Sequence, residues 1–112
     1  MDISYNDKKL REICNDERSL IKKFGKQIAE KIIMRLNEFA SAENLSEIPV
    51  SPPPRRHELA GERKGQFAVD LKHPYRLIFI PANDPLPIKS DGGVDLTKIS
   101  KIEILEVIDY HG

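Results

Sequence analysis

The stretch QFAVDLKHPYRLIFI, residues 66–80, decides the fold. Its first part alternates, with Phe67, Val69 and Leu71 separated by single residues, which predicts a strand with one buried face. The Lys-His-Pro triplet that follows predicts a turn. Tyr75–Ile80 is almost fully apolar after its second residue, which predicts a central strand. The stretch therefore predicts two strands joined by a turn, at the middle of a sheet.

Further strands are predicted on both sides of this pair. Arg55–Leu59 is compatible with a short strand, and the glycine-bounded segment Ala60–Gly65 predicts the turn that leads into the next one. After the pair, Pro81–Ser100 contains three prolines and a Gly-Gly step, which predicts a long loop. Ile102–Tyr110 predicts the last strand. The second half of the chain is therefore expected to be a strand meander.

The first half is expected to be helical. Asp2–Tyr5 predicts a short edge strand, after which Asp7 is a candidate N-cap for a helix through about Asn15. Asp16 is a candidate N-cap for a second helical piece, and Gly25 is expected to end it. This region therefore predicts two short helices before the longest one.

Residues 26–42 give the clearest helical pattern. Apolar residues recur there at spacings of four and three: Ile28, Ile32, Leu36 and Phe39. Charged residues are predicted to fill the exposed face of this helix: Lys26, Glu30, Lys31, Arg35 and Glu38. Core packing is the expected role of the apolar stripe. Helices followed by a meander predict a single α+β domain over residues 1–112, with N-terminal helices packed on one face of a small, mainly antiparallel sheet.

Composition excludes several classes of protein. No apolar run approaches the ~20 residues that a membrane-spanning helix needs, so no membrane contact is expected. The N-terminus has neither a cationic start nor an apolar block, so a cytoplasmic protein without a secretory signal is expected. The single cysteine, Cys14, cannot form an internal disulfide, and burial is its expected role. His57, His73 and His111 form no close ligand pair with one another or with Cys14, so no metal site is expected.

Charge is balanced over the chain but not along it. The 18 basic residues match the 18 acidic ones, which argues against nucleic-acid binding by bulk charge. Residues 51–80 nevertheless carry six basic and three acidic side chains. This segment is either a solvated strand surface, which is the simpler interpretation of the charges alone, or a site for phosphate.

One set of residues fits metal-free RNA cleavage: His57, Arg63, Lys64, Arg76, Asp109, Tyr110 and His111. Such a site needs a base for the ribose 2′-hydroxyl, an acid for the leaving 5′-oxygen, and fixed cations for the charge that develops on the phosphoryl group. Histidine suits the first two roles, and arginine suits the third because its planar fork can hold two phosphate oxygens. The structural alternative is a rim salt bridge at Arg76 and a terminal tail at His111.

Three motifs, in order, resemble one family. They are HELAGERKGQF at residues 57–67, YRLIF at residues 75–79 and the closing Asp109-Tyr110-His111. They resemble the HigB-like toxins, plasmid-maintenance killer proteins of the RelE/ParE toxin–antitoxin superfamily. The resemblance implies a microbial-RNase-like α+β fold. It also implies cleavage of mRNA in the ribosomal A site by 2′-hydroxyl attack, without metal or cofactor, which inhibits translation and arrests growth.

The resemblance also implies roles for individual residues. Arg76 would stabilise the phosphate, while His57 and His111 would act as acid and base or contact the phosphate. Two residues would orient or contact the substrate, Asp109 and Tyr110. Arg63 and Lys64 would contact the RNA. The implied partners are the ribosome with its mRNA and a cognate antitoxin of the HigA-like, helix-turn-helix type.

The chain departs from the family pattern at Ala60, where many members have a catalytic lysine. Loss of such a charge often costs ~10²–10³ in rate. Lys64 and Arg56 are the candidates to replace it as RNA-binding cations. The alternative function is therefore a catalytically weakened or inactive protein of the same fold that binds an antitoxin, or binds gyrase as ParE does. A third hypothesis is that the chain is itself the antitoxin. It is disfavoured because the sequence shows no helix-turn-helix pair suited to operator binding.

Overall fold

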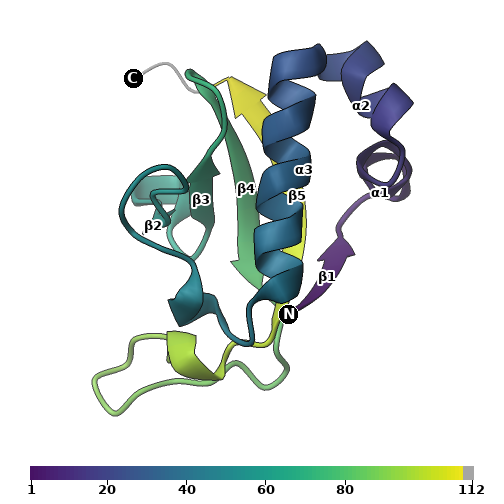
Figure 1. Ribbon diagram of the computed structural model, residues 1–112. Coiled ribbons are helices and arrows are strands. Elements are labelled where there is room, and N and C mark those ends of the chain that lie inside the picture. The colour runs from purple at the N-terminus through teal and green to yellow at the C-terminus, as the bar shows by residue number, and fades with distance from the viewer. Residues whose placement is uncertain (110–112) are drawn as a thin grey trace.

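The computed structural model describes residues 1–109, in which three α-helices precede most of the sheet (Figure 1). The strands are β1 Asp2–Tyr5, β2 His57–Glu58, β3 Phe67–Asp70, β4 Tyr75–Pro81 and β5 Lys101–Asp109. The helices are α1 Lys8–Cys14, α2 Glu17–Phe24 and α3 Lys26–Ser41. Short 3₁₀ turns are η1 Leu45–Glu47, η2 Gly61–Arg63 and η3 Leu96–Lys98.

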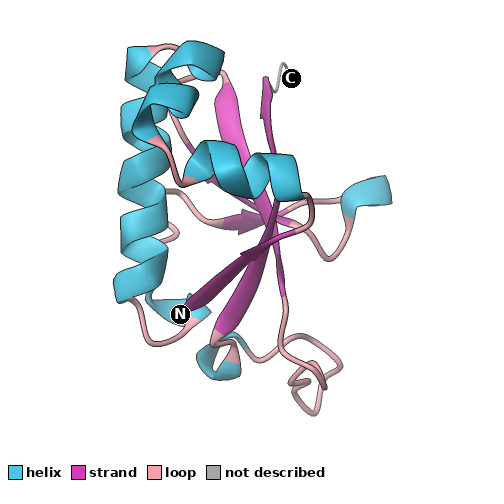
Figure 2. Cartoon of the chain, turned by 90° about the vertical axis from the view of Figure 1, so that its right-hand side faces the viewer, coloured by secondary structure: helices cyan, strands magenta, loops and turns pink. Residues whose placement is uncertain are grey.

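The sheet has the strand order β1-β5-β4-β3-β2 over the described residues. Neighbours from β2 to β5 are antiparallel, and β1 runs parallel to its neighbour β5. Helices α2 and α3 lie on one side of the sheet, α1 crosses the edge of the sheet beside β1, and a short helical turn projects from the other side (Figure 2). The predicted α+β class, the mainly antiparallel sheet and the central position of β4 are confirmed.

Local signals set the helix boundaries. The Asp7 carboxylate accepts a hydrogen bond from the Lys9 backbone nitrogen at 3.1 Å, as expected of an N-cap. The Asp16 carboxylate instead accepts from the Ser19 hydroxyl at 2.6 Å, although α2 begins directly after it as predicted. Gly25 separates α2 from α3 with φ of +84°, a conformation that favours glycine. Three predicted boundaries are therefore confirmed within a residue or two.

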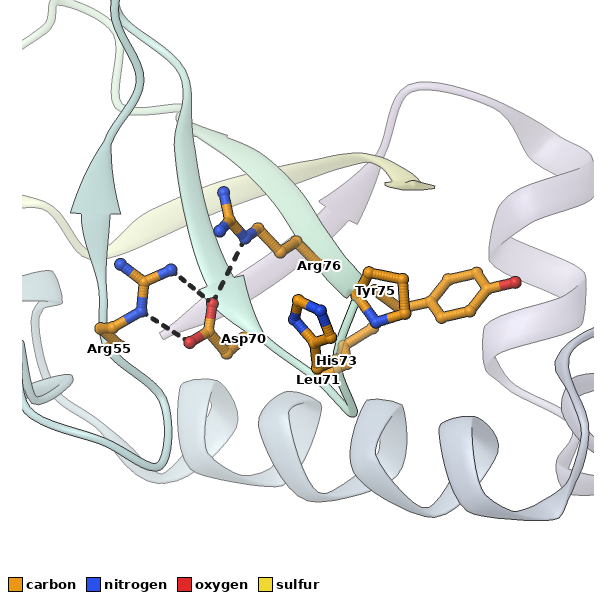
Figure 3. Close-up of a pocket in the computed structure, with 7 residues that line it drawn as sticks. Arg55, Asp70, Leu71, His73, Tyr75 and Arg76 are labelled. Atoms are coloured by element: carbon orange, nitrogen blue, oxygen red, sulfur yellow. Dashed lines mark hydrogen bonds and ion pairs between the residues drawn. The ribbon is translucent and has the colours of Figure 1, made fainter. Parts of the chain in front are cut away.

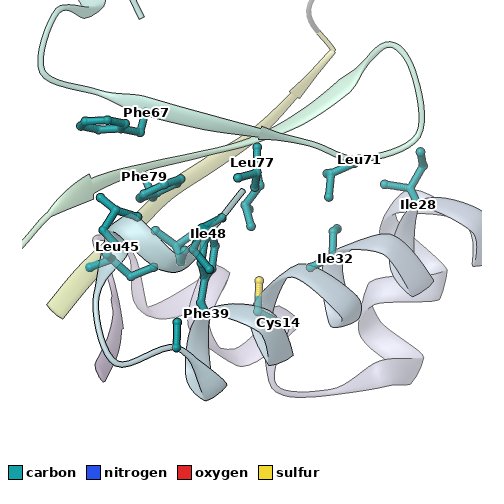
Figure 4. Packing of buried hydrophobic residues seen from close by; sticks show 14 of the residues in the cluster. Cys14, Ile28, Ile32, Phe39, Leu45, Ile48, Phe67, Leu71, Leu77 and Phe79 are labelled. Atoms are coloured by element: carbon teal, nitrogen blue, oxygen red, sulfur yellow. The ribbon is translucent and has the colours of Figure 1, made fainter. Parts of the chain in front are cut away.

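The core lies between α3 and the sheet (Figure 4). Ile28, Ile32 and Phe39 of the predicted stripe are buried, and Leu36 is half-buried. The Phe39 ring meets the Phe79 ring edge-on, with 4.9 Å between their centroids. The apolar stripe of α3 thus packs on the face of β4 that carries Phe79.

One prediction for α3 is wrong. Arg35 was expected on the exposed face, yet it is 1% exposed. Its position falls three residues after Ile32 and four before Phe39, so helix periodicity places it on the core face. Its Nε donates to the Asp70 backbone carbonyl at 2.8 Å, and Nη1 donates to Glu38 Oε1 at 3.0 Å. These bonds satisfy the buried guanidinium, which the residue type alone did not predict.

The loops contain more structure than predicted, and one strand contains less. β2 spans two residues, whereas Arg55–Leu59 was expected. The long loop 82–100 contains η3 and a bridge between Ile88 and Val94. Its end is attached to the helical half, because the Leu45 backbone nitrogen donates to the Ile99 carbonyl at 3.0 Å. None of the helices in residues 1–109 combines the length and apolar character that a membrane crossing requires.

Candidate functional site

The candidate site lies on the sheet face that the helices leave uncovered, called here the outer face. Asp70 of β3 pairs with Arg76 of β4, so both side chains stand on the same face. Val69 and Leu77 alternate with them and belong to the core, which places the first pair on the outer face. His57 of β2 pairs two positions along β3 from Asp70, and therefore shares this face.

Asp70 joins two arginines (Figure 3). Arg55 approaches edge-on, with Nε 2.7 Å from Oδ2 and Nη2 3.0 Å from Oδ1. From the other side, Arg76 Nε lies 3.5 Å from Oδ1. The hydrogen bond to Asp70 raises the pKa of Arg55 above its ordinary value, so this guanidinium stays charged. Two positive charges therefore meet one negative charge at this point.

A pocket of about 240 Å³ opens beside this group. Its wall is formed by Arg55, Asp70 and Arg76 together with the turn between β3 and β4: Leu71, His73, Pro74 and Tyr75. The Tyr75 ring points away from the Asp70 carboxylate (Figure 3). The pocket is small, polar and net positive, which suits an anion the size of a phosphate group.

His57 is attached to the same group through Arg55. Its Nδ1 lies 2.7 Å from the Arg55 carbonyl oxygen. A carbonyl oxygen only accepts, so Nδ1 carries a hydrogen and donates it. The other ring nitrogen, Nε2, takes no part in this bond. The half-buried ring is therefore oriented by the residue that binds Asp70.

Arg63 lies on the same side of the sheet but is engaged elsewhere. From the end of η2, its Nη1 donates to Gln66 Oε1 at 2.8 Å, and its Nη2 lies 3.5 Å from Glu106 Oε1 on β5. Glu106 pairs with Ile78, which places it on the outer face. Arg63 therefore ties the η2 turn across the outer face to β5.

The two predicted replacements for the missing lysine lie in different surroundings. Arg56 donates from Nε to the Ile48 carbonyl at 2.9 Å, and burial lowers the pKa of its guanidinium. Lys64 is exposed at the end of η2, and Ala60 is exposed at the start of that turn. Arg56 is therefore engaged with the segment after η1, and Lys64 lies at the opposite end of the η2 turn from Ala60.

The predicted C-terminal residues lie only partly within the described chain. Asp109, the last residue of β5, pairs with Tyr75 rather than with Arg76. Strand alternation therefore assigns Asp109 to the face opposite Arg76. Tyr110 and His111 lie outside the described residues. Of the predicted catalytic residues up to position 109, the structure places His57 and Arg76 on one face.

Sequence reasoning missed Arg55 and Asp70. A signal existed for Asp70, because a turn centred on His73 pairs positions 70 and 76 across the two strands. No sequence signal marked Arg55, since its approach to Asp70 depends on the path of the preceding proline segment. Within residues 1–109, no group of three His, Cys, Asp or Glu side chains is arranged to hold a metal ion.

Solved structures with the same fold include two toxins. The chain aligns with a YoeB/ParE toxin from Agrobacterium tumefaciens with a TM-score of 0.58 and 10% identity, over 99% of this chain and 100% of that one. It aligns with a chain of the YoeB–YefM complex from Staphylococcus aureus with a TM-score of 0.53 and 13% identity, over 100% and 98% of the two chains. No protein-family model matches the chain, and a comparison with curated protein sequences finds no relative. The shared property is the fold.

Proposed function

We propose that this protein is the toxin of a type II toxin–antitoxin system and that it cleaves mRNA on the ribosome. The observation that carries the proposal is the group of Arg55, Arg76 and His57 on the outer face of a fold found in YoeB/ParE toxins. The sequence motifs at residues 57–67 and 75–79 favour the HigB-like branch of that superfamily. Cations and a histidine on one open face match the needs of metal-free phosphodiester cleavage.

The proposed reaction needs no group beyond the chain and its substrate. A base removes the proton of a ribose 2′-hydroxyl, and the 2′-oxygen forms a bond to the adjacent phosphorus. The bond from phosphorus to the 5′-oxygen breaks, and that oxygen takes a proton from an acid. The products are a 2′,3′-cyclic phosphate and a 5′-hydroxyl end. His57 is proposed for one proton transfer and His111 for the other.

Arg76 is proposed to stabilise the negative charge that develops on the phosphoryl oxygens. Arg63 and Lys64 are proposed RNA contacts beside the η2 turn. Tyr110 is proposed to contact the substrate, and Asp109, which strand alternation places on the face opposite Arg76, is proposed to orient the substrate indirectly. Arg56 is proposed as a further RNA-binding cation. Arg76 and His57 lie on the same face of the sheet and both are partly exposed, as contact with a ribosome-bound mRNA requires.

The partners follow from the same proposal. One of the structural neighbours is a complex of YoeB with YefM, and its name supports an antitoxin as the partner of this fold. A HigA-like, helix-turn-helix antitoxin is the specific partner proposed. The ribosome with mRNA in its A site is the proposed target, and the cytoplasm is the compartment in which both are met.

The alternative function is a binding module without cleavage. Ala60 favours it, because the lysine carried there by many HigB-like toxins is absent. An action on gyrase, which the resemblance to the RelE/ParE superfamily implies, also belongs to this alternative. In that case expression would arrest growth while mRNA stays intact, or would capture an antitoxin without toxicity.

The test is expression of the chain without its neighbouring gene, followed by mapping of mRNA 5′ ends. We expect growth arrest and new 5′-hydroxyl ends inside coding regions. Arg76→Ala should abolish both, with a rate loss of about 10²–10³. Arg18→Ala, an exposed arginine on α2, is the matched control and should cleave as the wild type does. Arrest that persists in Arg76→Ala with intact mRNA contradicts cleavage and supports the binding module.

A further inference from the structure

We propose that Arg55 and Arg76 together seat the scissile phosphate, with Arg55 as a second cation beside Arg76. Asp70 is the positioning residue that holds the two guanidinium groups. This inference rests on the proposed function and names the phosphate-binding part of that site. The two-arginine seat, as it is called below, consists of Arg55, Asp70 and Arg76.

The contacts of Asp70 define the seat. Arg55 uses its Nε and Nη2 hydrogens on the carboxylate, at 2.7 and 3.0 Å. A guanidinium has five N–H donors, so three donors of Arg55 are left for an anion. The Arg55 side chain is 38% exposed and that of Arg76 is 22% exposed, so both are reachable while half-sheltered from water. Arginine in such a setting is well suited to bidentate phosphate binding.

The charge of the seat favours an anion. One carboxylate offsets only one of the two guanidinium groups, so the three side chains carry a net positive charge. This charge borders the pocket of about 240 Å³ that also reaches His73. A phosphodiester gains negative charge in the transition state, and fixed cations at that place lower its energy.

The backbone of Arg55 is held in a costly conformation. Its φ is +48°, which makes it the single non-glycine residue in the left-handed region among residues 1–109. Such a conformation is disfavoured for a residue with a side chain and persists only where its surroundings enforce it. Here the Arg55 nitrogen donates to the Ser51 carbonyl at 3.1 Å, and the Asp70 nitrogen donates to the Pro54 carbonyl at 2.8 Å. The backbone around Arg55 is therefore fixed before any ligand arrives.

Arg55 also connects the seat to the proposed proton-transfer residue. Its carbonyl oxygen accepts the Nδ1 hydrogen of His57 at 2.7 Å. Arg63 and Arg56 are used in other contacts, to Glu106 and to the Ile48 carbonyl. Arg55, in contrast, binds the same carboxylate as Arg76, that of Asp70.

The first measurement needs no ribosome. The protein labelled at arginine Nε is titrated with inorganic phosphate, and the Nε–Hε signals of Arg55 and Arg76 are followed by NMR. We expect both signals to move together and saturate. Arg55→Ala should weaken phosphate binding at least about tenfold, Arg55→Lys should restore part of it, and Arg18→Ala should leave it unchanged. If the Arg76 signal of Arg55→Ala saturates at the same phosphate concentration as in the wild type, the two-arginine seat is contradicted.

The second measurement is single-turnover cleavage of mRNA on purified ribosomes. We expect Arg55→Ala to lower the rate constant at saturating toxin about 10²-fold, with a smaller loss for Arg55→Lys. Arg55→Gln keeps a hydrogen-bond donor for Asp70 but removes the charge, so it should fail as Arg55→Ala does. If Arg55→Gln cleaves mRNA as fast as the wild type and Arg55→Ala has a lowered melting temperature, the role of Arg55 is structural only. That result contradicts the proposal.

The two measurements separate the inference from the proposed function. If the wild-type protein binds phosphate through Arg55 but does not cleave mRNA, the two-arginine seat is supported and the endonuclease function is contradicted. If the wild-type protein cleaves mRNA and Arg55→Gln cleaves it equally fast, the endonuclease function is supported and the two-arginine seat is contradicted.

Discussion

The two faces of the sheet are built by opposite means. On the helix side, Leu77 and Phe79 are fully buried beneath α3. On the outer face, the same strand presents Arg76, whose side chain is 22% exposed and held by an ion pair. The helix side is stabilised by non-directional apolar burial, which tolerates many sequences. The outer face has a smaller apolar cluster of Leu59, Ala68 and Ile78, and its chemistry depends on the direction and spacing of the charged groups beside that cluster.

The largest expected effect is on the helix side. Phe79→Ala removes a ring that contacts both Phe39 and Phe67, with centroids 4.9 and 5.9 Å away. We expect the free energy of unfolding to fall by about 3–5 kcal/mol, because the transfer energy is lost and a cavity is left. Urea denaturation followed by circular dichroism measures this change.

The matched variant for that experiment is Arg76→Ala, which lies on the same strand as Phe79 but on the outer face. Because its ion pair with Asp70 is partly exposed, we expect Arg76→Ala to change the free energy of unfolding by less than about 1 kcal/mol. Equal losses in Phe79→Ala and Arg76→Ala would contradict the difference between the faces.

A smaller effect is expected where the two faces are connected. Arg35 binds the backbone carbonyl of Asp70 from the helix side, while the carboxylate of Asp70 binds arginines on the outer face. Arg35→Ala leaves that carbonyl without its buried donor and removes the packing of the side-chain stem. We expect a loss of about 3 kcal/mol in the free energy of unfolding.

Lys26→Ala is the control for Arg35→Ala, because Lys26 is an exposed cation at the start of the same helix. It should change the free energy of unfolding by less than about 0.5 kcal/mol. If both variants lose the same stability, Arg35 is not the internal connection that its contacts indicate.

The contrast between the faces explains what the sequence could predict. Apolar periodicity identified α3, the buried positions of β3 and the central place of β4, because burial repeats with the period of each element. The same rule was not followed at Arg35, where a charged side chain occupies a core position and finds its partners at Asp70 and Glu38. Periodicity was correct there, and residue type was misleading.

The outer face was predictable only in part. The motifs pointed to His57 and Arg76, which the structure places on one face. Arg55 was missed because its position depends on a left-handed backbone at φ +48° after the proline segment, which no propensity rule indicates. Ion pairs between distant segments leave no period in a sequence, so they emerge only when the chain is folded.

The last prediction concerns a residue buried on the helix side, and the expected effect depends on pH. Burial raises the pKa of the Cys14 thiol to about 11, from 9.0. The folded state therefore favours the neutral thiol. Its contribution to the free energy of unfolding is fully present below the thiol pKa of the unfolded chain, and it is lost as the pH rises from about 9 to 11. We expect about 2 kcal/mol of stability to disappear by about pH 10.5.

The measurement is the free energy of unfolding in urea between about pH 7.5 and 10.5, for the wild type and for Cys14→Ala. Cys14→Ala loses packing equally at every pH, so only the slope of stability against pH reports the thiol. The pKa of Tyr5 is also raised, to about 12, first by burial and then by the charge of Cys14, so its own contribution is lost only above about pH 10. The slope of stability against pH between about pH 9 and 10 therefore reports Cys14. Parallel curves for the two proteins would mean that water reaches the thiol, so that Cys14 is less buried than the structure indicates.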